Sequence, residues 1–75
     1  MRIHLVLEAI LERYAPENAG ACEIPAEMTV GELIRHLGIP EDLVMFAIVD
    51  GHMATRETVV RENASVSLCP YICGG

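Results

Sequence analysis

Aromatic residues are scarce in this chain: tryptophan is absent, and one phenylalanine and two tyrosines make up 4% of the sequence. Hydrophobic residues nevertheless account for 52% of the 75 residues. The core must therefore be built from aliphatic side chains and methionine, in a chain whose composition is that of a folded protein. A chain of this length has room for one compact core, which argues against a buried active-site cavity.

Basic residues are also few. Five lysine or arginine residues stand against eleven acidic residues, which gives a net charge of −6. Such a chain repels phosphate backbones and anionic membrane surfaces, so we expect neither nucleic acid nor lipid as a partner. The charge fits a protein partner with a basic docking surface, and it fits equally well an acidic surface that only confers solubility.

Long hydrophobic runs are missing as well. The longest covers the seven residues 43–49, whereas a helix needs about 20 residues to cross a bilayer. The first eleven residues are interrupted by Arg2, His4 and Glu8 and lack the apolar stretch of a signal peptide. The three cysteines cannot all pair with one another. Together these features predict a cytoplasmic protein with reduced thiols.

The first part of the chain changes its periodicity. Residues 1–7 alternate between apolar and polar side chains, which predicts a half-buried strand. The next apolar residues follow helical spacing and predict a short helical segment that ends before Pro16. That spacing is carried by Leu7, Ile10, Leu11 and Tyr14. A turn at residues 18–20 then leads to a short strand over residues 21–24, antiparallel to the first.

The best local signal is a T-x-x-E capping box made of Thr29 and Glu32, which predicts the first turn of a helix. Met28 is placed to form a hydrophobic staple with Leu33. Gly38 occupies the position of a left-handed C-cap, and a proline two residues later prevents continuation. The apolar stripe that should pack on a sheet consists of Val30, Leu33, Ile34 and Leu37.

The second half of the chain predicts further strands. The apolar run of residues 43–49 is typical of a strand buried on both faces, and the Asp50-Gly51 dipeptide predicts a hairpin turn into a short partner strand. After a polar turn, residues 65–69 alternate again, and Pro70 ends this last strand. The order fits an α+β domain, with one helix packed on a mixed sheet whose first and last strands lie side by side.

The T-V-x-E-L-I helix opening, the V-D-G turn and the C-P-Y-I-C-G-G end resemble the MoaD/ThiS family of sulfur carriers over essentially the whole chain. Where family members commonly show V-N-G, V-x-L, a proline and a terminal glycine pair, this chain has Val49-Asp50-Gly51, Val66-Ser67-Leu68, Pro70 and Gly74-Gly75. The usual glycine-aspartate turn is replaced by Asn63-Ala64, and asparagine tolerates the left-handed conformation. The resemblance implies one β-grasp (ubiquitin-like) domain over residues 1–75, with a flexible Gly-Gly tail at 70–75.

The resemblance also implies a chemical role for the C-terminus. A ubiquitin-activating-type enzyme would use ATP to adenylate the Gly75 carboxylate. A sulfur donor, persulfide or sulfide, would then displace AMP and leave a thiocarboxylate that gives its sulfur to cofactor biosynthesis through a downstream synthase subunit. The residues that would thread into the partner active sites are Ile72, Cys73 and Gly74. Glycine suits a narrow site because it lacks a Cβ. The chain itself would bind no cofactor and would be a substrate rather than an enzyme.

No catalytic constellation or metal site is expected among the side chains. Cys69 and Cys73 would lie roughly 13 Å apart in an extended segment, too far for a disulfide. No second Cys or His pair completes a zinc site, and the histidines are expected on the surface. Cys22 is interpreted as a small buried residue. Cys73 stands where relatives generally carry a small apolar residue, which makes it the thiol to test.

Alternative functions remain both within the family and beyond it. Residues 7–13 resemble the F-A-x-L-R-E stretch of molybdopterin synthase small subunits, which favours that pathway over a thiamin thiazole carrier or a carrier for another metabolite. A ubiquitin-like interaction module would instead use its sheet face as a docking surface and needs no terminal glycines. A protein modifier would use the same activated tail and form isopeptide adducts on lysines.

Overall fold

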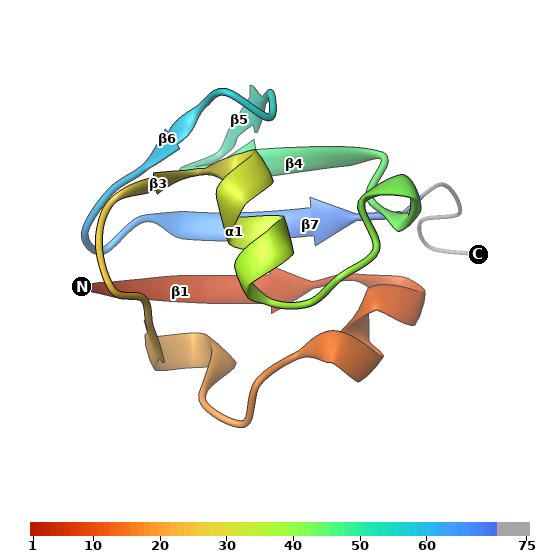
Figure 1. The fold of residues 1–75 in the computed structure, drawn as a ribbon, viewed down its shortest axis with the longest axis horizontal. Coiled ribbons are helices and arrows are strands. Elements are labelled where there is room, and N and C mark those ends of the chain that lie inside the picture. The colour runs from red at the N-terminus through yellow and green to blue at the C-terminus, as the bar shows by residue number, and fades with distance from the viewer. Residues whose placement is uncertain (71–75) are drawn as a thin grey trace.

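The computed structural model describes residues 1–70, and in it one α-helix packs on a mixed sheet (Figure 1). In chain order the elements are β1 (Arg2–Leu7), η1 (Ala9–Tyr14), η2 (Ala19–Ala21), β2 (Cys22–Glu23), β3 (Met28–Thr29), α1 (Val30–His36), η3 (Glu41–Leu43), β4 (Phe46–Val49), β5 (His52–Ala54), β6 (Val59–Val60) and β7 (Ser65–Cys69), where η marks a 3-10 helix. The main sheet has the strand order β2-β1-β7-β4-β5, and β3 pairs with β6.

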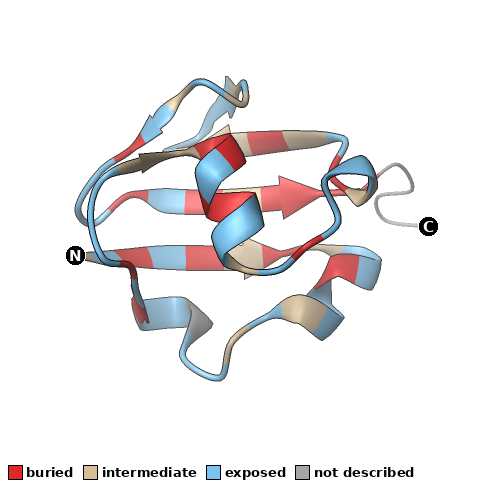
Figure 2. Ribbon diagram, viewed as in Figure 1, coloured by how far each residue is buried: buried red, intermediate tan, exposed pale blue. Residues whose placement is uncertain are grey.

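The first and last strands form the centre of the main sheet. β1 and β7 run parallel, in a register that pairs Leu5 with Val66 and Leu7 with Leu68. Their other neighbours, β2 and β4, are antiparallel to them. Buried residues are concentrated in β1 and β7, where α1 crosses the sheet (Figure 2). The predicted α+β architecture, with these two strands side by side, is confirmed.

Helix α1 begins where the capping box predicts it. The Glu32 backbone N–H donates to Thr29 Oγ1 at 3.2 Å, and the Thr29 backbone N–H donates to Glu32 Oε1 at 2.9 Å. Val30, Leu33 and Ile34 are buried, as the predicted stripe requires. The helix gives way to a turn in which Gly38 has a φ of 75°, a left-handed conformation that glycine adopts without strain.

The hairpin between β4 and β5 also agrees with the sequence. Asp50 and Gly51 have φ angles of 51° and 83°, as a type I′ turn requires. The Asp50 Oδ1 atom accepts a hydrogen bond from the Ser65 N–H at 2.9 Å, which ties the turn to β7. Asn63 has a φ of 64°, so it does adopt the left-handed conformation that allows it to replace glycine in its turn.

The prediction of one doubly buried strand over residues 43–49 is wrong. Leu43 ends a 3-10 helix, Met45 is 58% exposed, and β4 begins only at Phe46. The physical reason is that α1 covers one face of the sheet, so the alternating side chains of β4 cannot all be buried. Ala47 points toward the helix and is 3% exposed, whereas Phe46 points to the other face and is half-buried.

The segment after β1 departs from its prediction in detail. It is helical over Ala9–Tyr14, but it is a 3-10 helix with three residues per turn. Leu11 is fully buried, whereas Ile10 is 59% exposed, because the tighter helix does not keep both on one face. Among the described residues, no helix has the length and apolar character needed to cross a membrane.

Candidate functional site

The tail that carries the predicted reactive group starts at the end of β7. Leu68 and Cys69 are buried, and Pro70 has less than 2% of its surface exposed. We call residues 68–70 the tail base. The predicted site residues lie outside the described part of the chain; they are Ile72, Cys73, Gly74 and Gly75.

Backbone hydrogen bonds hold the tail base from both sides. The Glu8 N–H, just after β1, donates to the Leu68 carbonyl oxygen at 3.0 Å. The Met45 N–H, just before β4, donates to the Cys69 carbonyl oxygen at 2.8 Å. Because both neighbours of β7 contribute a donor, Leu68 and Cys69 belong to the centre of the sheet, and Pro70 follows directly after the strand.

An apolar group of side chains lies beside the tail base on the face of the sheet opposite α1, which we call the outer face. Phe46 is paired with Cys69, and Ile48 is paired with Ser67 on one side and Met53 on the other. Paired residues share a face of the sheet. Met53 is 71% exposed, and Phe46 and Ile48 are half-buried. We call Phe46, Ile48 and Met53 the outer-face patch.

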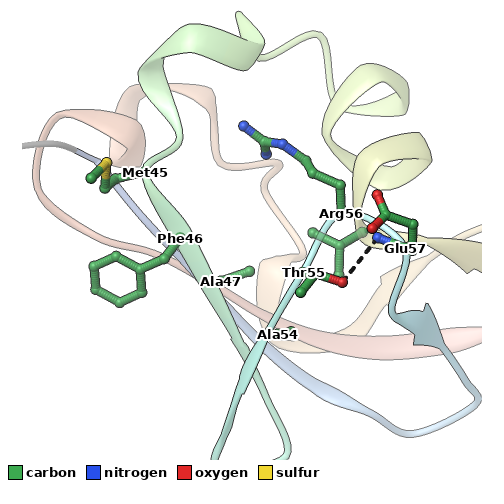
Figure 3. A pocket seen from close by; sticks show the side chains of 8 residues that line it. Met45, Phe46, Ala47, Ala54, Thr55, Arg56 and Glu57 are labelled. Carbon is green, nitrogen blue, oxygen red and sulfur yellow. Dashed lines mark hydrogen bonds between the residues drawn. The ribbon is translucent and has the colours of Figure 1, made fainter.

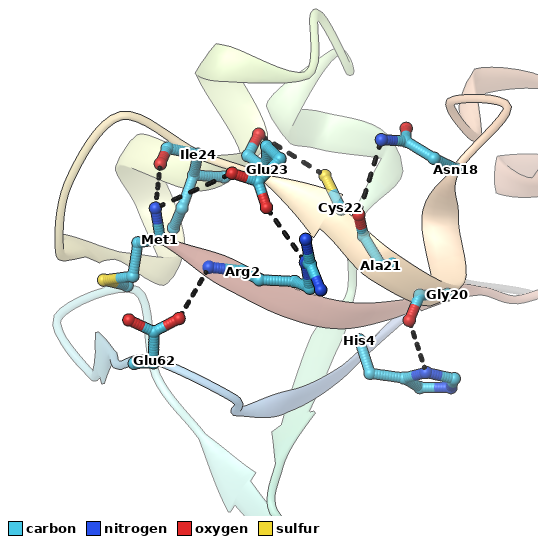
Figure 4. A network of polar contacts seen from close by, with 10 residues as sticks. All are labelled: Met1, Arg2, His4, Asn18, Gly20, Ala21, Cys22, Glu23, Ile24 and Glu62. Atoms are coloured by element: carbon cyan, nitrogen blue, oxygen red, sulfur yellow. Dashed lines mark hydrogen bonds and ion pairs between the residues drawn. The ribbon is translucent and has the colours of Figure 1, made fainter.

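The other half of the outer face, on β1 and β2, carries the polar residues Arg2, His4 and Glu23, which Figure 4 shows, and the half-buried Val6. Arg2 Nε lies 3.0 Å from Glu23 Oε2, and both side chains are more than half exposed. The Met1 amino group donates to the Ile24 carbonyl oxygen at 3.1 Å, and His4 is exposed. Exposed ion pairs of this kind contribute little to stability. The contacts join β1 to β2 and show no arrangement of a general acid with a base.

A pocket of about 250 Å³ lies beside β4 and is bounded by the start of α1 and by the segment after β5. Its apolar wall includes Val30, Ala47 and Ala54, and Arg56 lies at its polar side. Figure 3 shows the Phe46 ring pointing away from Arg56, which agrees with its place on the outer face. Phe46 therefore belongs both to the pocket lining and to the outer-face patch, and its ring points away from the arginine.

Arg56 makes structural contacts in this region that the sequence does not predict. Its Nη2 atom donates to the carbonyl oxygens of Glu41 and Val44, both at 3.0 Å. Its own carbonyl oxygen accepts from the Gly31 N–H at 3.0 Å. The partners are backbone atoms 12 or more residues away in the chain, so no local motif marks the contact.

The cysteines and histidines agree with their predicted roles where the structure describes them. Cys22 is 4% exposed, and burial, with a further contribution from Glu23, raises the pKa of its thiol. His4, His36 and His52 are exposed. Within residues 1–70, no group of three or more His, Cys, Asp or Glu side chains has the placement to hold a metal ion.

A mixed sheet with parallel first and last strands at its centre, crossed by a single main helix, is the β-grasp fold of ubiquitin-like proteins. Residues 9–75 match the model of the ThiS family, and the chain belongs to this family, which is the MoaD/ThiS family of sulfur carriers. Its members are small carrier proteins rather than catalysts, and they generally work with an adenylating enzyme and a synthase. A search of curated proteins found no match.

Proposed function

We propose that this chain is a sulfur carrier whose Gly75 carboxylate is adenylated and then converted to a thiocarboxylate. The observation that carries the proposal is the family match, which runs through the terminal glycine pair to residue 75. The tail base supports it, because a buried proline and two backbone hydrogen bonds fix the point at which the tail leaves the sheet. A partner that grips the last residues thus meets a carrier body of defined orientation.

The proposed chemistry divides the work between the carrier and its partners. A carboxylate oxygen of Gly75 attacks the α-phosphorus of ATP, and pyrophosphate leaves. A sulfide sulfur then attacks the acyl carbon, AMP leaves, and the thiocarboxylate remains. With a persulfide donor the first product is an acyl disulfide, which a second thiol must cleave. The carrier supplies the acyl group, and the activating enzyme and sulfur donor supply the catalytic groups.

The length of the tail determines where the activating enzyme docks. Five residues follow Pro70, and a fully extended chain of that length spans at most about 17 Å. An enzyme that holds Gly75 in its active site must therefore also contact the carrier close to the tail base. Met45, with 58% of its surface exposed, and the outer-face patch are apolar surfaces near this point. We propose them as the contact region for the enzyme.

For the pathway, we propose the molybdopterin type first, because of the family-like stretch at residues 7–13. The thiamin thiazole type is the alternative within the same family. Complementation of bacterial strains that lack either carrier separates the two: growth is restored only in the strain whose pathway accepts this chain. Restoration of the thiamin strain alone would overturn the molybdopterin assignment.

Intact mass spectrometry tests the carrier function itself. Protein without a C-terminal tag, co-expressed with its activating enzyme and a sulfur source, should show a species heavier by the difference between sulfur and oxygen, about 16 Da. Deletion of Gly75 should remove this species. An interaction module would instead keep its biological function without Gly75, and a modifier would appear as isopeptide adducts on the lysines of other proteins.

A further inference from the structure

Arg56 connects the start of α1 with the segment that precedes β4. From these contacts we infer that Arg56 is a positioning residue for activation of the tail: it holds residues 41–45 in place beside the tail base, where the activating enzyme docks. The inference rests on the proposed carrier function for its docking part. Its structural part concerns contacts within the folded chain and is tested without any partner.

The contacts of Arg56 all involve backbone atoms. Nη2 donates to the carbonyl oxygens of Glu41 and Val44, which lie at the start of η3 and just after its end. The Arg56 carbonyl oxygen accepts from Gly31 in the first turn of α1. Hydrogen bonds from a charged donor are stronger than those between neutral groups. The Arg56 side chain thus holds the segment before β4 at two points, and the Arg56 backbone is bonded to the helix.

The segment that Arg56 holds is bonded directly to the tail base. Val44 is 3% exposed, and the next residue, Met45, donates its N–H to the Cys69 carbonyl oxygen at 2.8 Å. A shift of the Val44 carbonyl group therefore moves the Met45 donor and the exposed Met45 side chain together. Arg56 in this way controls one of the two hydrogen bonds on the tail base. Its side chain and the Phe46 ring point away from each other (Figure 3).

Two other arginines show why this role falls to Arg56. Arg35 also reaches the segment, but through the side chain of Glu41 at 3.4 Å, with both side chains at least half exposed. Arg61 pairs with Glu27 at 3.1 Å on the surface, away from the tail base. Exposed pairs of this kind fix a segment weakly, because solvent screens them and both side chains lose conformational freedom.

Three variants separate a positioning role from simple packing. Arg56→Met keeps most of the aliphatic length and removes the donor. Arg56→Lys keeps a charged donor on a side chain of similar length. Arg61→Met makes the same chemical change at a surface ion pair and is the matched control.

Amide hydrogen exchange, followed by NMR on the isolated carrier, gives the first measurement. Loss of a charge-assisted hydrogen bond should speed exchange of the Met45 amide by about tenfold in Arg56→Met. The Val66 amide, in the central strand, should exchange as in the wild type, which shows that the fold is retained. Arg56→Lys should restore at least part of the protection, and Arg61→Met should change neither amide. Unchanged Met45 exchange in Arg56→Met would overturn the inference.

Steady-state adenylation with the activating enzyme gives the second measurement. If residues 41–45 belong to the docking surface, Arg56→Met should raise KM for the carrier several-fold and leave kcat unchanged, because the reacting carboxylate is untouched. Arg56→Lys should recover part of the loss. Faster Met45 exchange with an unchanged KM would refute the role in docking. If the wild-type chain is not adenylated at all, the proposed function fails and the docking part with it, whereas the exchange data still decide what Arg56 holds.

Discussion

The two faces of the main sheet are built by the same strands but have opposite surroundings. On the face that α1 covers, Leu5, Val66 and Leu68 are at most 2% exposed. On the outer face, Met53 is 71% exposed and Phe46 is half-buried, although these side chains are equally apolar. Apolar groups stabilise the fold in proportion to the area removed from water. The helix-covered face therefore holds the domain together, and the outer face leaves apolar area exposed, which we propose as a contact region for the activating enzyme.

The largest effect should come from the helix-covered face. Leu68→Ala removes a fully buried side chain from the central strand, and we expect it to lower the free energy of unfolding by about 2–5 kcal/mol. Urea denaturation followed by circular dichroism measures this. Ile48→Ala, on the outer face of the adjacent strand, is the comparison and should cost less than half as much. Equal costs for the two variants would contradict the difference between the faces.

A smaller loss of stability should follow when the N-cap of the helix that covers this face is removed. Thr29→Ala removes the N-cap acceptor of α1 and should cost about 1 kcal/mol. Ser65→Ala, an exposed change on the outer face, should stay within about 0.5 kcal/mol of the wild type. Urea midpoints for the two variants test this order, and a Ser65→Ala cost as large as that of Thr29→Ala would argue against it.

The capping box also gives this second prediction a pH dependence. Hydrogen bonding to the backbone and side chain of Thr29 lowers the pKa of Glu32 below its ordinary value of 4.5. A carboxylate whose pKa is lower in the folded state stabilises the fold above its ordinary pKa, and this contribution is lost as the pH falls through the lowered value. Thr29→Ala keeps the backbone N–H that is the larger cause, so it should remove only part of this pH dependence. Glu32→Gln should remove it, and its urea midpoints at neutral and acid pH should differ less than those of the wild type.

The smallest effect on stability should come from the outer-face patch. Met53→Ser changes a side chain that is already 71% exposed, so the free energy of unfolding should move by no more than about 0.5 kcal/mol. The same substitution should raise KM for adenylation, because it removes apolar area from the proposed contact region. His36→Ser, an exposed change on α1, is the control and should leave KM unchanged. A Met53→Ser variant with wild-type KM would remove the patch from the docking surface.

Local signals in the sequence predict much of the fold. The Thr29 and Glu32 pair fixes the start of α1 because both of its hydrogen bonds lie within four consecutive residues. The Asp50-Gly51 turn needs two left-handed residues in succession, which this dipeptide supplies. Alternation in residues 1–7 and 65–69 identifies the central strands. The pairing of first and last strands then follows from the order of the elements.

The failures have a common cause, because each depends on contacts between distant residues. An apolar run such as 43–49 shows which residues avoid water, but not that α1 is able to cover only one face of β4. The β3 and β6 pair has two residues in each strand, too few for a periodic pattern. Arg56 recognises backbone carbonyl groups, which have no sequence signature. The predicted site residues Ile72, Cys73, Gly74 and Gly75 stay predictions, because they lie beyond the described residues.

The central claim is that Gly75 supplies the reactive group while the rest of the chain positions it. Its most direct test is the intact mass of untagged protein, co-expressed with its activating enzyme and a sulfur source, for the wild type and for the chain lacking Gly75. We predict a thiocarboxylate species, heavier by about 16 Da, in the wild type only, with the same urea midpoint for both chains. A wild-type protein that never carries this species, or a shortened chain that still does, would contradict the account.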